Sequence, residues 1–302
     1  MKLKSLTLLA AGSVLLVAIT GCGTPGSAGK PTESVSAASG DGPYQLKIEK
    51  SPSFAAGSTM EKLSQAGSIR IGTKYDQPLF GLLGTGDVPA GFDVAIGALV
   101  ASKLGIPFNK IKFSETVSAN REPFLQNNQV DSVVATYTIN DKRKQVVSFA
   151  GPYFLAGQAV LVLNDNKTIT GPEDLAGKPV CSVEGSTPAA NIVAKYNAKL
   201  VPTDVYSNCL DPLRNKQVDA MTTDNVILSG FVDQNKGEFK IVGKPFTEEP
   251  YGIGLAKDDT AFRGFINDVL EKSFTDGTWA RLFKETAGKV LDAPQPPTIN
   301  RY

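Results

Sequence analysis

The sequence of 302 residues contains no histidine. This absence excludes Ser-His-Asp and Cys-His nucleophilic sites, histidine-based acid–base catalysis and most zinc sites. Cysteine is scarce, with three residues, and after the N-terminus no segment is long and apolar enough to span a membrane. The 31 basic and 30 acidic residues nearly cancel, so nothing favours nucleic acid as a partner. An enzyme would depend on carboxylates, lysine or tyrosine, and we expect no metal and no cofactor.

The N-terminus has the features of an export segment. Two lysines in the first four residues precede an apolar run from Leu6 to Ile19, shorter than the roughly 20 residues of a membrane-spanning helix. The run ends in Ile19-Thr20-Gly21-Cys22, which resembles the bacterial lipobox, where cleavage leaves a cysteine that carries lipid. We therefore predict a signal peptide over residues 1–21 and a lipid on Cys22 that anchors the exported protein to the outer face of the cell membrane. A signal with an incidental cysteine, or an uncleaved anchor, is the alternative.

The two remaining cysteines are Cys181 and Cys209. Outside the cytoplasm they favour a disulfide, which would stabilise the fold by about 3 kcal/mol in the chain-entropy account. Two separate buried thiols are the alternative. Without histidine, two cysteines make a poor metal site.

The rest of the chain divides into a tether and a folded part. Small residues and proline dominate residues 23–43, and with the ambiguous residues 44–57 we assign 22–57 to a lipidated tether. Ser58 and Glu61 form a capping box that opens a helix ending near Gly67. The expected strands are 68–73, 111–113, 130–135, 159–163, 179–183, 218–221 and 253–256, and the expected helices are 92–104, 119–127, 141–145, 187–196, 224–233, 261–273 and 278–283. This alternation indicates α/β layers around mainly parallel sheets.

A short repeat links the two halves. Asn128-Gln129-Val130-Asp131 leads into a strand and then Thr136, while Lys216-Gln217-Val218-Asp219 leads into a strand and then Asp224. The repeat predicts a polar residue at the carboxyl end of an equivalent strand in each half, where open α/β sheets bind ligands. Chance similarity is the alternative.

Eight short motifs follow one another between residues 68 and 285. They are Ile71-Gly72-Thr73, Ala90-Gly91-Phe92-Asp93-Val94, Ser118-Ala119-Asn120-Arg121 with Gln129-Val130-Asp131, Thr138-Ile139-Asn140-Asp141-Lys142-Arg143, Gly151-Pro152-Tyr153, Gly185-Ser186-Thr187, Ala220-Met221-Thr222-Thr223-Asp224, and Tyr251-Gly252-Ile253-Gly254. In this order they resemble the polar amino-acid substrate-binding proteins of ABC importers, bacterial solute-binding protein family 3, most of all its glutamate/aspartate-binding lipoproteins.

The resemblance implies the two-lobed periplasmic-binding-protein type II fold, an α/β fold with a ligand cleft between the lobes. Two crossovers would join the lobes near residues 154–158 and 249–252. Lobe 1 would comprise residues 58–157 and 251–302, and lobe 2 residues 158–250.

The resemblance also implies how the α-carboxylate of an amino acid is held. It assigns Arg143 and Thr138 to this group, and the planar guanidinium fork of Arg143 suits a carboxylate. Ser186 and Thr187 open a helix whose backbone N–H groups could bind the same carboxylate. The alternatives are a surface arginine in the basic run 142–144 and an ordinary helix cap.

Asp224 is the candidate partner of the α-ammonium, with Thr136 as its counterpart from the other lobe. The alternative for Asp224 is a helix N-cap.

Five residues are candidates for the ligand side chain: Ser118, Arg121, Lys74, Gln77 and Tyr206. By the resemblance, Ser118 and Arg121 match positions that hold glutamate or aspartate, and Lys74 would add a second cation. An Asn-Arg pair also occurs in relatives that bind other polar amino acids, and Tyr206 stands near a position where some acidic-amino-acid binders have histidine. Gln77 could favour an amide. For Lys74 and Tyr206 the alternative is solvated surface.

These inferences predict a monomeric receptor, not an enzyme, that delivers an amino acid to an ABC permease. Glutamate is the first candidate, followed by aspartate or glutamine. One alternative is an enzyme on the same scaffold, such as a small-acid dehydratase using Glu184 or Glu248. Another is a sensory lipoprotein.

Overall fold

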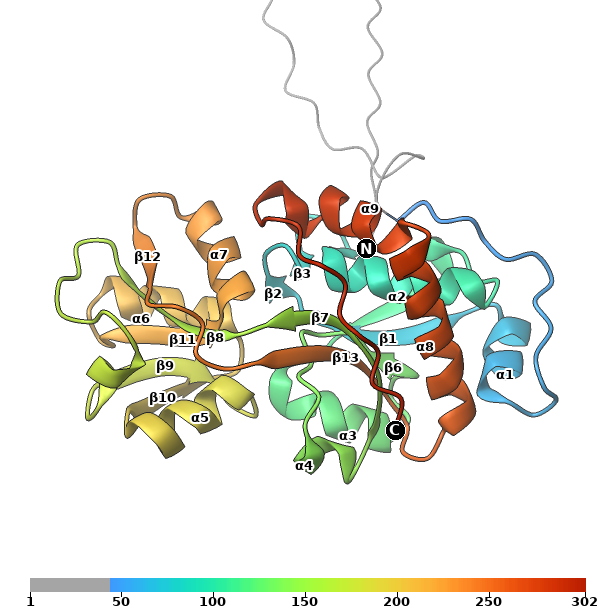
Figure 1. Ribbon diagram of the computed structural model, residues 1–302, viewed down its shortest axis with the longest axis horizontal. Helices are drawn as coiled ribbons and strands as arrows, with labels where there is room; N and C mark the ends of the chain where they lie inside the picture. The colour runs from blue at the N-terminus through green and yellow to red at the C-terminus, as the bar shows by residue number, and fades with distance from the viewer. Residues whose placement is uncertain (1–43) are drawn as a thin grey trace, which may run out of the picture. The chain divides into compact units, whose positions relative to one another are not determined.

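The computed structural model describes residues 44–302 (Figure 1). The predicted signal peptide, lipidation at Cys22 and most of the tether lie outside these residues. Among the described helices none is both long and apolar enough to cross a membrane.

Lobe 1 is built around a five-stranded sheet with strand order β5-β1-β6-β13-β7. Its strands are β1 (Ile69–Thr73), β5 (Ile111–Glu115), β6 (Ser132–Val133), β7 (Ser148–Ala156) and β13 (Glu249–Leu255). Strand β1 runs parallel to β5 and β6, whereas β13 runs antiparallel to β6 and β7. The helices of this lobe are α1 (Thr59–Ala66), α2 (Phe92–Lys103), α3 (Arg121–Gln126), α4 (Asp141–Lys144), α8 (Thr260–Thr275) and α9 (Thr278–Glu285).

Lobe 2 repeats this plan with strand order β10-β9-β11-β8-β12. Its strands are β8 (Gln158–Leu163), β9 (Pro179–Val183), β10 (Lys199–Thr203), β11 (Ala220–Asp224) and β12 (Phe239–Val242), and its helices are α5 (Thr187–Tyr196), α6 (Leu210–Arg214) and α7 (Asn225–Gln234). Strand β9 of lobe 2, like β1 of lobe 1, lies between two parallel neighbours, whereas β8 runs antiparallel to β11 and β12. A small third sheet, β2-β3-β4, is formed by β2 (Asp76–Gln77), β3 (Gly81–Leu83) and β4 (Pro89–Ala90).

Two segments pass between the sheets. The first is the step from β7 to β8 across Gly157, and the second joins β12 to β13. Strands β7 and β13 lie side by side, with Glu249 opposite Ala156 (Figure 1). A side chain at Gly157 would come within 2.6 Å of the Thr247 carbonyl oxygen, so glycine allows the two segments to approach.

Local sequence explains the main elements. Every residue of α2 from Phe92 to Ser102 is buried, as expected of a helix that is apolar on all sides. Its Phe92 packs against Trp279 and Phe283, with ring centroids 5.6 and 5.4 Å apart, in the core of lobe 1. At α1, Ser58 Oγ accepts from the Glu61 backbone N–H at 3.2 Å, and Gly67 ends the helix with a left-handed φ of 61°.

Several elements differ from the sequence prediction. Strand β6 spans two residues instead of six, and β7, β10, β12, α6 and the small third sheet were not predicted. The ambiguous residues before Ser58 pack on lobe 1 instead of continuing the tether. Tyr44 stacks on Phe108 at 4.7 Å, and Phe54 meets Phe265 edge-on at 5.5 Å.

Candidate functional site

The predicted ligand-binding residues converge on one small pocket between the lobes, with an empty volume of about 210 Å³. Eight of the eleven predicted residues line it, together with two that were not predicted. The lining residues are Ser118, Arg121, Thr136, Thr138, Ser186, Thr187, Pro188, Tyr206, Asp224 and Ile227. Lys74 and Gln77 lie behind this lining, and Arg143 lies at its outer side.

Asp224 ends β11 and is 3% exposed. It stands at the N-cap position of α7, but its side chain makes no capping hydrogen bond. Oδ2 accepts from the Tyr251 hydroxyl at 2.5 Å, whereas Oδ1 has no partner among the described residues. Burial, and then the charge of Glu249, raise the pKa of Asp224 to about 7. A buried carboxylate with one free oxygen is suited to accept from a cationic N–H.

Thr136 reaches the same pocket from lobe 1. Its φ of 43° is unusual for a β-branched residue. The Asp93 carboxylate holds this turn, because it accepts from the Thr136 backbone N–H at 2.8 Å and from the Tyr153 hydroxyl at 2.6 Å. Thr136 Oγ1 donates to Gln77 Oε1 at 2.9 Å, which leaves the buried Gln77 Nε2 without an acceptor among the described residues. Gln77 thus has a free donor beside the pocket.

Asp93 was not predicted as a site residue. The sequence feature that could have marked it is an acidic residue in the first turn of the otherwise mostly apolar helix α2. Its complete burial raises the pKa of the carboxyl group to about 6.

Arg121 lines the pocket, and a second buried cation, Lys74, lies behind it against Ser118. Lys74 is 2% and Arg121 3% exposed, so the surface interpretation of Lys74 is wrong. Lys74 Nζ donates to Ser118 Oγ at 2.9 Å, and Arg121 donates only to backbone carbonyl oxygens, at 3.2 to 3.4 Å. Among the described residues, neither cation has a carboxylate within 4.0 Å.

Burial first, and neighbouring positive charge second, lower the pKa values of these two cations. Burial, followed by the charge of Arg121, lowers the pKa of Lys74 to about 7. Burial, followed by the charge of Arg143, lowers the pKa of Arg121 to about 10. An incoming anion would relieve both effects.

Arg143 is 7% exposed and therefore not a surface arginine. Asn140 caps the short helix α4 by accepting from the Arg143 backbone N–H at 2.9 Å. The guanidinium donates to the Thr138 carbonyl at 2.7 Å and, across the lobes, to the Gly185 carbonyl at 3.0 Å. Its Nε pairs with Glu122 at 3.1 Å. Arg143 lines a wider outer groove next to the small pocket, so it reaches the pocket from its rim.

The residues from lobe 2 are held by caps and by the disulfide. Ser186 Oγ caps α5 by accepting from the Ala189 N–H at 3.1 Å, which is the ordinary cap that the sequence left open. Cys181 and Cys209 are joined, as predicted, and tie β9 to the 3-10 helix Tyr206–Cys209. Tyr206 is 3% exposed at the start of that helix, so its surface interpretation is wrong.

The hydroxyls of Thr138 and Thr187 bind Glu249, a residue that was not predicted from the sequence. Both donate to the buried Glu249 Oε2 at 2.7 Å. No local pattern marks Glu249, because these partners lie 111 and 62 positions away in the chain. The two predicted acids of an enzyme, Glu184 and Glu248, are exposed. The described residues contain no cluster of side chains suited to hold a metal ion.

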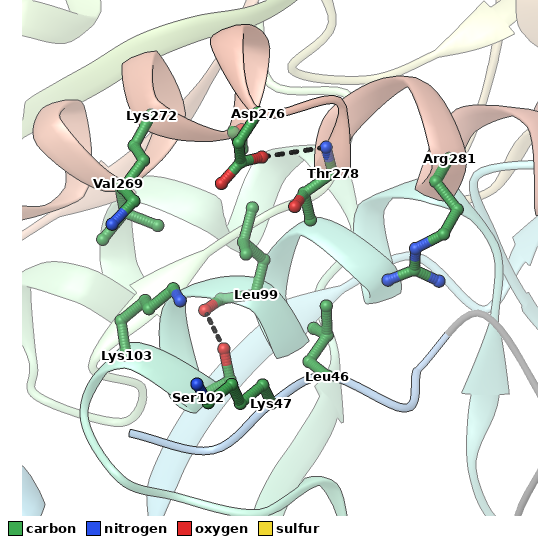
Figure 2. A pocket seen from close by; sticks show the side chains of 11 residues that line it. Leu46, Lys47, Leu99, Ser102, Lys103, Val269, Lys272, Asp276, Thr278 and Arg281 are labelled. Carbon is green, nitrogen blue, oxygen red and sulfur yellow. Dashed lines mark hydrogen bonds between the residues drawn. The ribbon is translucent and has the colours of Figure 1, made fainter. Parts of the chain in front are cut away.

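A separate pocket of about 550 Å³ lies in lobe 1, away from these residues (Figure 2). Leu46, the α2 residues Leu99 and Lys103, and residues of α8 and α9 line it. Two hydrogen bonds are formed among its lining residues: Ser102 donates to the Leu99 carbonyl at 2.7 Å, and Asp276 accepts from the Thr278 N–H at 2.9 Å. None of the predicted ligand-binding residues lies there.

Residues 69–289 match the family described as bacterial extracellular solute-binding proteins, family 3. The chain belongs to this family. The match confirms the family that the sequence motifs predicted.

Curated relatives are similar along most of their length. The glutamate-binding protein GluB of Corynebacterium efficiens is 42% identical over 243 residues, which cover 77% of this chain and 83% of that protein. The ABC transporter glutamine-binding protein GlnH of Bacillus subtilis is 36% identical over 288 residues, covering 94% and 96%. The first is thus a glutamate-binding protein, and the second is a glutamine-binding protein of an ABC transporter.

Solved structures confirm the predicted fold. An ancestral arginine-binding protein bound to arginine has a TM-score of 0.68 at 35% identity, covering 73% of this chain and 98% of that one. The same kind of protein bound to glutamine has a TM-score of 0.68 at 36% identity, covering 73% and 97%. The chain thus has the two-lobed α/β fold of amino-acid-binding proteins.

Proposed function

We propose that this protein is the substrate-binding receptor of an ABC importer and that it binds L-glutamate between its lobes. The pair Lys74 and Arg121 carries the proposal. A buried cation without a counter-ion is costly. Arg121 lines the pocket, Lys74 donates to the lining residue Ser118 from behind it, and the sole carboxylate in that lining is Asp224. A side-chain carboxylate there would supply the counter-charge that an amide could not.

The remaining contacts suit the rest of an amino acid. Asp224 Oδ1 is available to the α-ammonium, and Thr136 lies on the opposite lobe. We infer that Arg143 from lobe 1 and the backbone N–H groups at the start of α5 from lobe 2 bind the α-carboxylate, which is supported by the hydrogen bond that Arg143 donates across the lobes to the Gly185 carbonyl. A few charge-assisted hydrogen bonds of this kind support micromolar affinity, about −8 kcal/mol.

Glutamine is the second candidate, favoured by the free Gln77 Nε2, which can donate to an amide oxygen. Its support also comes from the glutamine-binding relative and from the ancestral structure bound to glutamine.

Calorimetry on the soluble chain from residue 23 onward separates these candidates. We expect L-glutamate to bind with a Kd at or below about 1 µM, with L-aspartate and L-glutamine weaker. Arg143→Ala should abolish binding of every amino acid, whereas Arg121→Ala should change their ranking. Tighter binding of glutamine than of glutamate refutes the acidic ligand, and no binding below the millimolar range refutes the receptor.

The same proposal places the receptor on the cell surface as a monomer, held by lipid on Cys22 beside its permease. In this arrangement Cys22→Ser releases the protein from the membrane fraction. Retention of the Cys22→Ser protein in that fraction would refute the lipid anchor.

A further inference from the structure

Glu249 is a buried acid at the start of the second crossover strand. It is 4% exposed and lies opposite Ala156 of the first crossover strand. Among the described residues no lysine or arginine lies within 4.0 Å of its carboxylate. Three hydroxyl groups satisfy it instead: Thr138 and Thr187 donate to Oε2, each at 2.7 Å, and Thr247 donates to Oε1 at 2.8 Å.

The three hydroxyls come from three different parts of the fold. Thr138 belongs to lobe 1, where it forms a bridge with Tyr251 of β13. Thr187 is the first residue of α5 in lobe 2. Thr247 lies in the segment between β12 and β13. One carboxylate oxygen therefore joins the two lobes, and the two donating oxygens are 3.4 Å apart.

We propose that Glu249 is a closure latch, whose carboxylate binds the hydroxyls of Thr138 and Thr187 together only when the lobes are closed. When the lobes separate, the carboxylate keeps its bonds within lobe 1 and the crossover but loses Thr187. A hydrogen bond to a charged group contributes roughly a 10- to 100-fold change in an equilibrium, and water recovers part of this in the open protein. We therefore expect the latch to favour closure by about 10-fold.

The latch changes the role of the two threonines. Because each hydroxyl has one hydrogen, and Glu249 takes both, neither can donate to a ligand carboxylate. Thr138 and Thr187 then act on affinity through closure, as positioning residues. The α-carboxylate is left to guanidinium and backbone N–H groups. This inference deepens the proposed function and rests on it only for the ligand used as a probe.

Stopped-flow kinetics on the mature chain test the latch, with the fluorescence of the single tryptophan, Trp279, as a signal. Glu249→Gln and Thr187→Val should each raise the dissociation rate of L-glutamate about 10-fold and leave the association rate within about twofold. The double variant should dissociate no faster than either single variant, since both changes act on the same bond between the lobes, from Thr187 to Glu249. Thr187→Ser keeps the hydroxyl and should behave as wild type. Glu248→Gln, an exposed neighbour, is the matched control.

Three results would overturn the latch. The first is an unchanged dissociation rate in Glu249→Gln. The second is additive effects in the double variant. The third is complete loss of glutamate binding in Glu249→Gln with native circular dichroism, which would place Glu249 on the ligand itself.

Small-angle scattering of the ligand-free protein provides a reading that does not depend on the ligand. Glu249→Gln should increase the radius of gyration relative to wild type and to Glu248→Gln. An unchanged radius of gyration would count against the latch. If no amino acid binds the wild-type protein, the proposed function fails while this measurement still decides the latch.

Discussion

Replacing Asp224 by Asn should stabilise the ligand-free protein at alkaline pH while weakening ligand binding. The pKa of Asp224 is raised from 3.8 to about 7, mainly by burial. Folding therefore favours the protonated acid, and the associated stability, present at low pH, is lost as the pH rises through 7. At 1.36 kcal/mol per pKa unit, this loss of stability reaches about 4 kcal/mol. An asparagine at this position does not ionise, so the variant does not lose this stability as the pH rises.

The pH dependence of the stability separates the cost of ionising Asp224 from any contacts that the new amide makes, because those contacts do not change with pH. Between pH 5 and pH 8 the stability of Asp224→Asn relative to wild type should rise by about 2–3 kcal/mol. Other buried groups such as Asp93 and Lys74 titrate in both proteins, so their contributions cancel. Affinity for L-glutamate should fall roughly 10- to 100-fold, because a charge-assisted bond to the α-ammonium is lost.

Urea unfolding followed by Trp279 fluorescence measures the stability, and calorimetry measures the affinity. Asp219→Asn is the matched control, since its side chain is 45% exposed and should change neither quantity. A stability difference that is the same at pH 5 and pH 8 would refute the buried-charge reasoning. Wild-type affinity in Asp224→Asn would refute its contact with the ligand.

Three further changes test other features. A Cβ at Gly230 of α7 would lie 2.9 Å from the lobe 1 loop between β2 and β3, whereas Gly264 of α8 has open space. In calorimetry and unfolding, Gly230→Ala should therefore weaken glutamate binding without destabilising the protein, and Gly264→Ala should leave binding unchanged. By calorimetry, Lys74→Met should weaken binding of glutamate more than of glutamine. Replacing both Cys181 and Cys209 by Ser should lower the free energy of urea unfolding by about 3 kcal/mol.

The sequence repeat predicted the relation between the lobes because it encodes the same backbone turn twice. Asn128 and Lys216 both have a φ of 55°. The following residues, Gln129 and Gln217, each donate a backbone hydrogen bond at 2.9 Å to the helix before. Each turn feeds the third strand of its sheet.

Local patterns of this kind are readable from sequence because all their partners lie within a few positions. The repeat therefore placed Thr136 and Asp224 in one pocket correctly.

The parts that sequence reasoning missed depend on distant partners. The carboxylate of Asp93 and the Tyr153 hydroxyl are 60 positions apart, and nothing near either residue predicts the bond. Strand β6 was predicted too long because buried apolar residues continue past it without strand pairing. The sequence did not decide whether Lys74 is a surface residue or a site residue, because a lysine is usually exposed. Its burial results from packing between distant segments.

The distribution of charge between the lobes explains how a ligand and closure are linked. Lobe 1 provides the cations Lys74, Arg121 and Arg143, while Asp224 comes from lobe 2. In the proposed function, an acidic amino acid would bring carboxylates to the first set and an ammonium to the second, and it would contact both sets only when the lobes are together. Among the described residues, Lys74 and Arg121 have no carboxylate partner, and Asp224 Oδ1 has no donor. A ligand with both signs of charge would therefore stabilise the closed state over the open one. Glu249 adds a smaller contribution in the same direction that does not depend on the ligand. The ligand's charges therefore complete a closure that the protein already favours slightly.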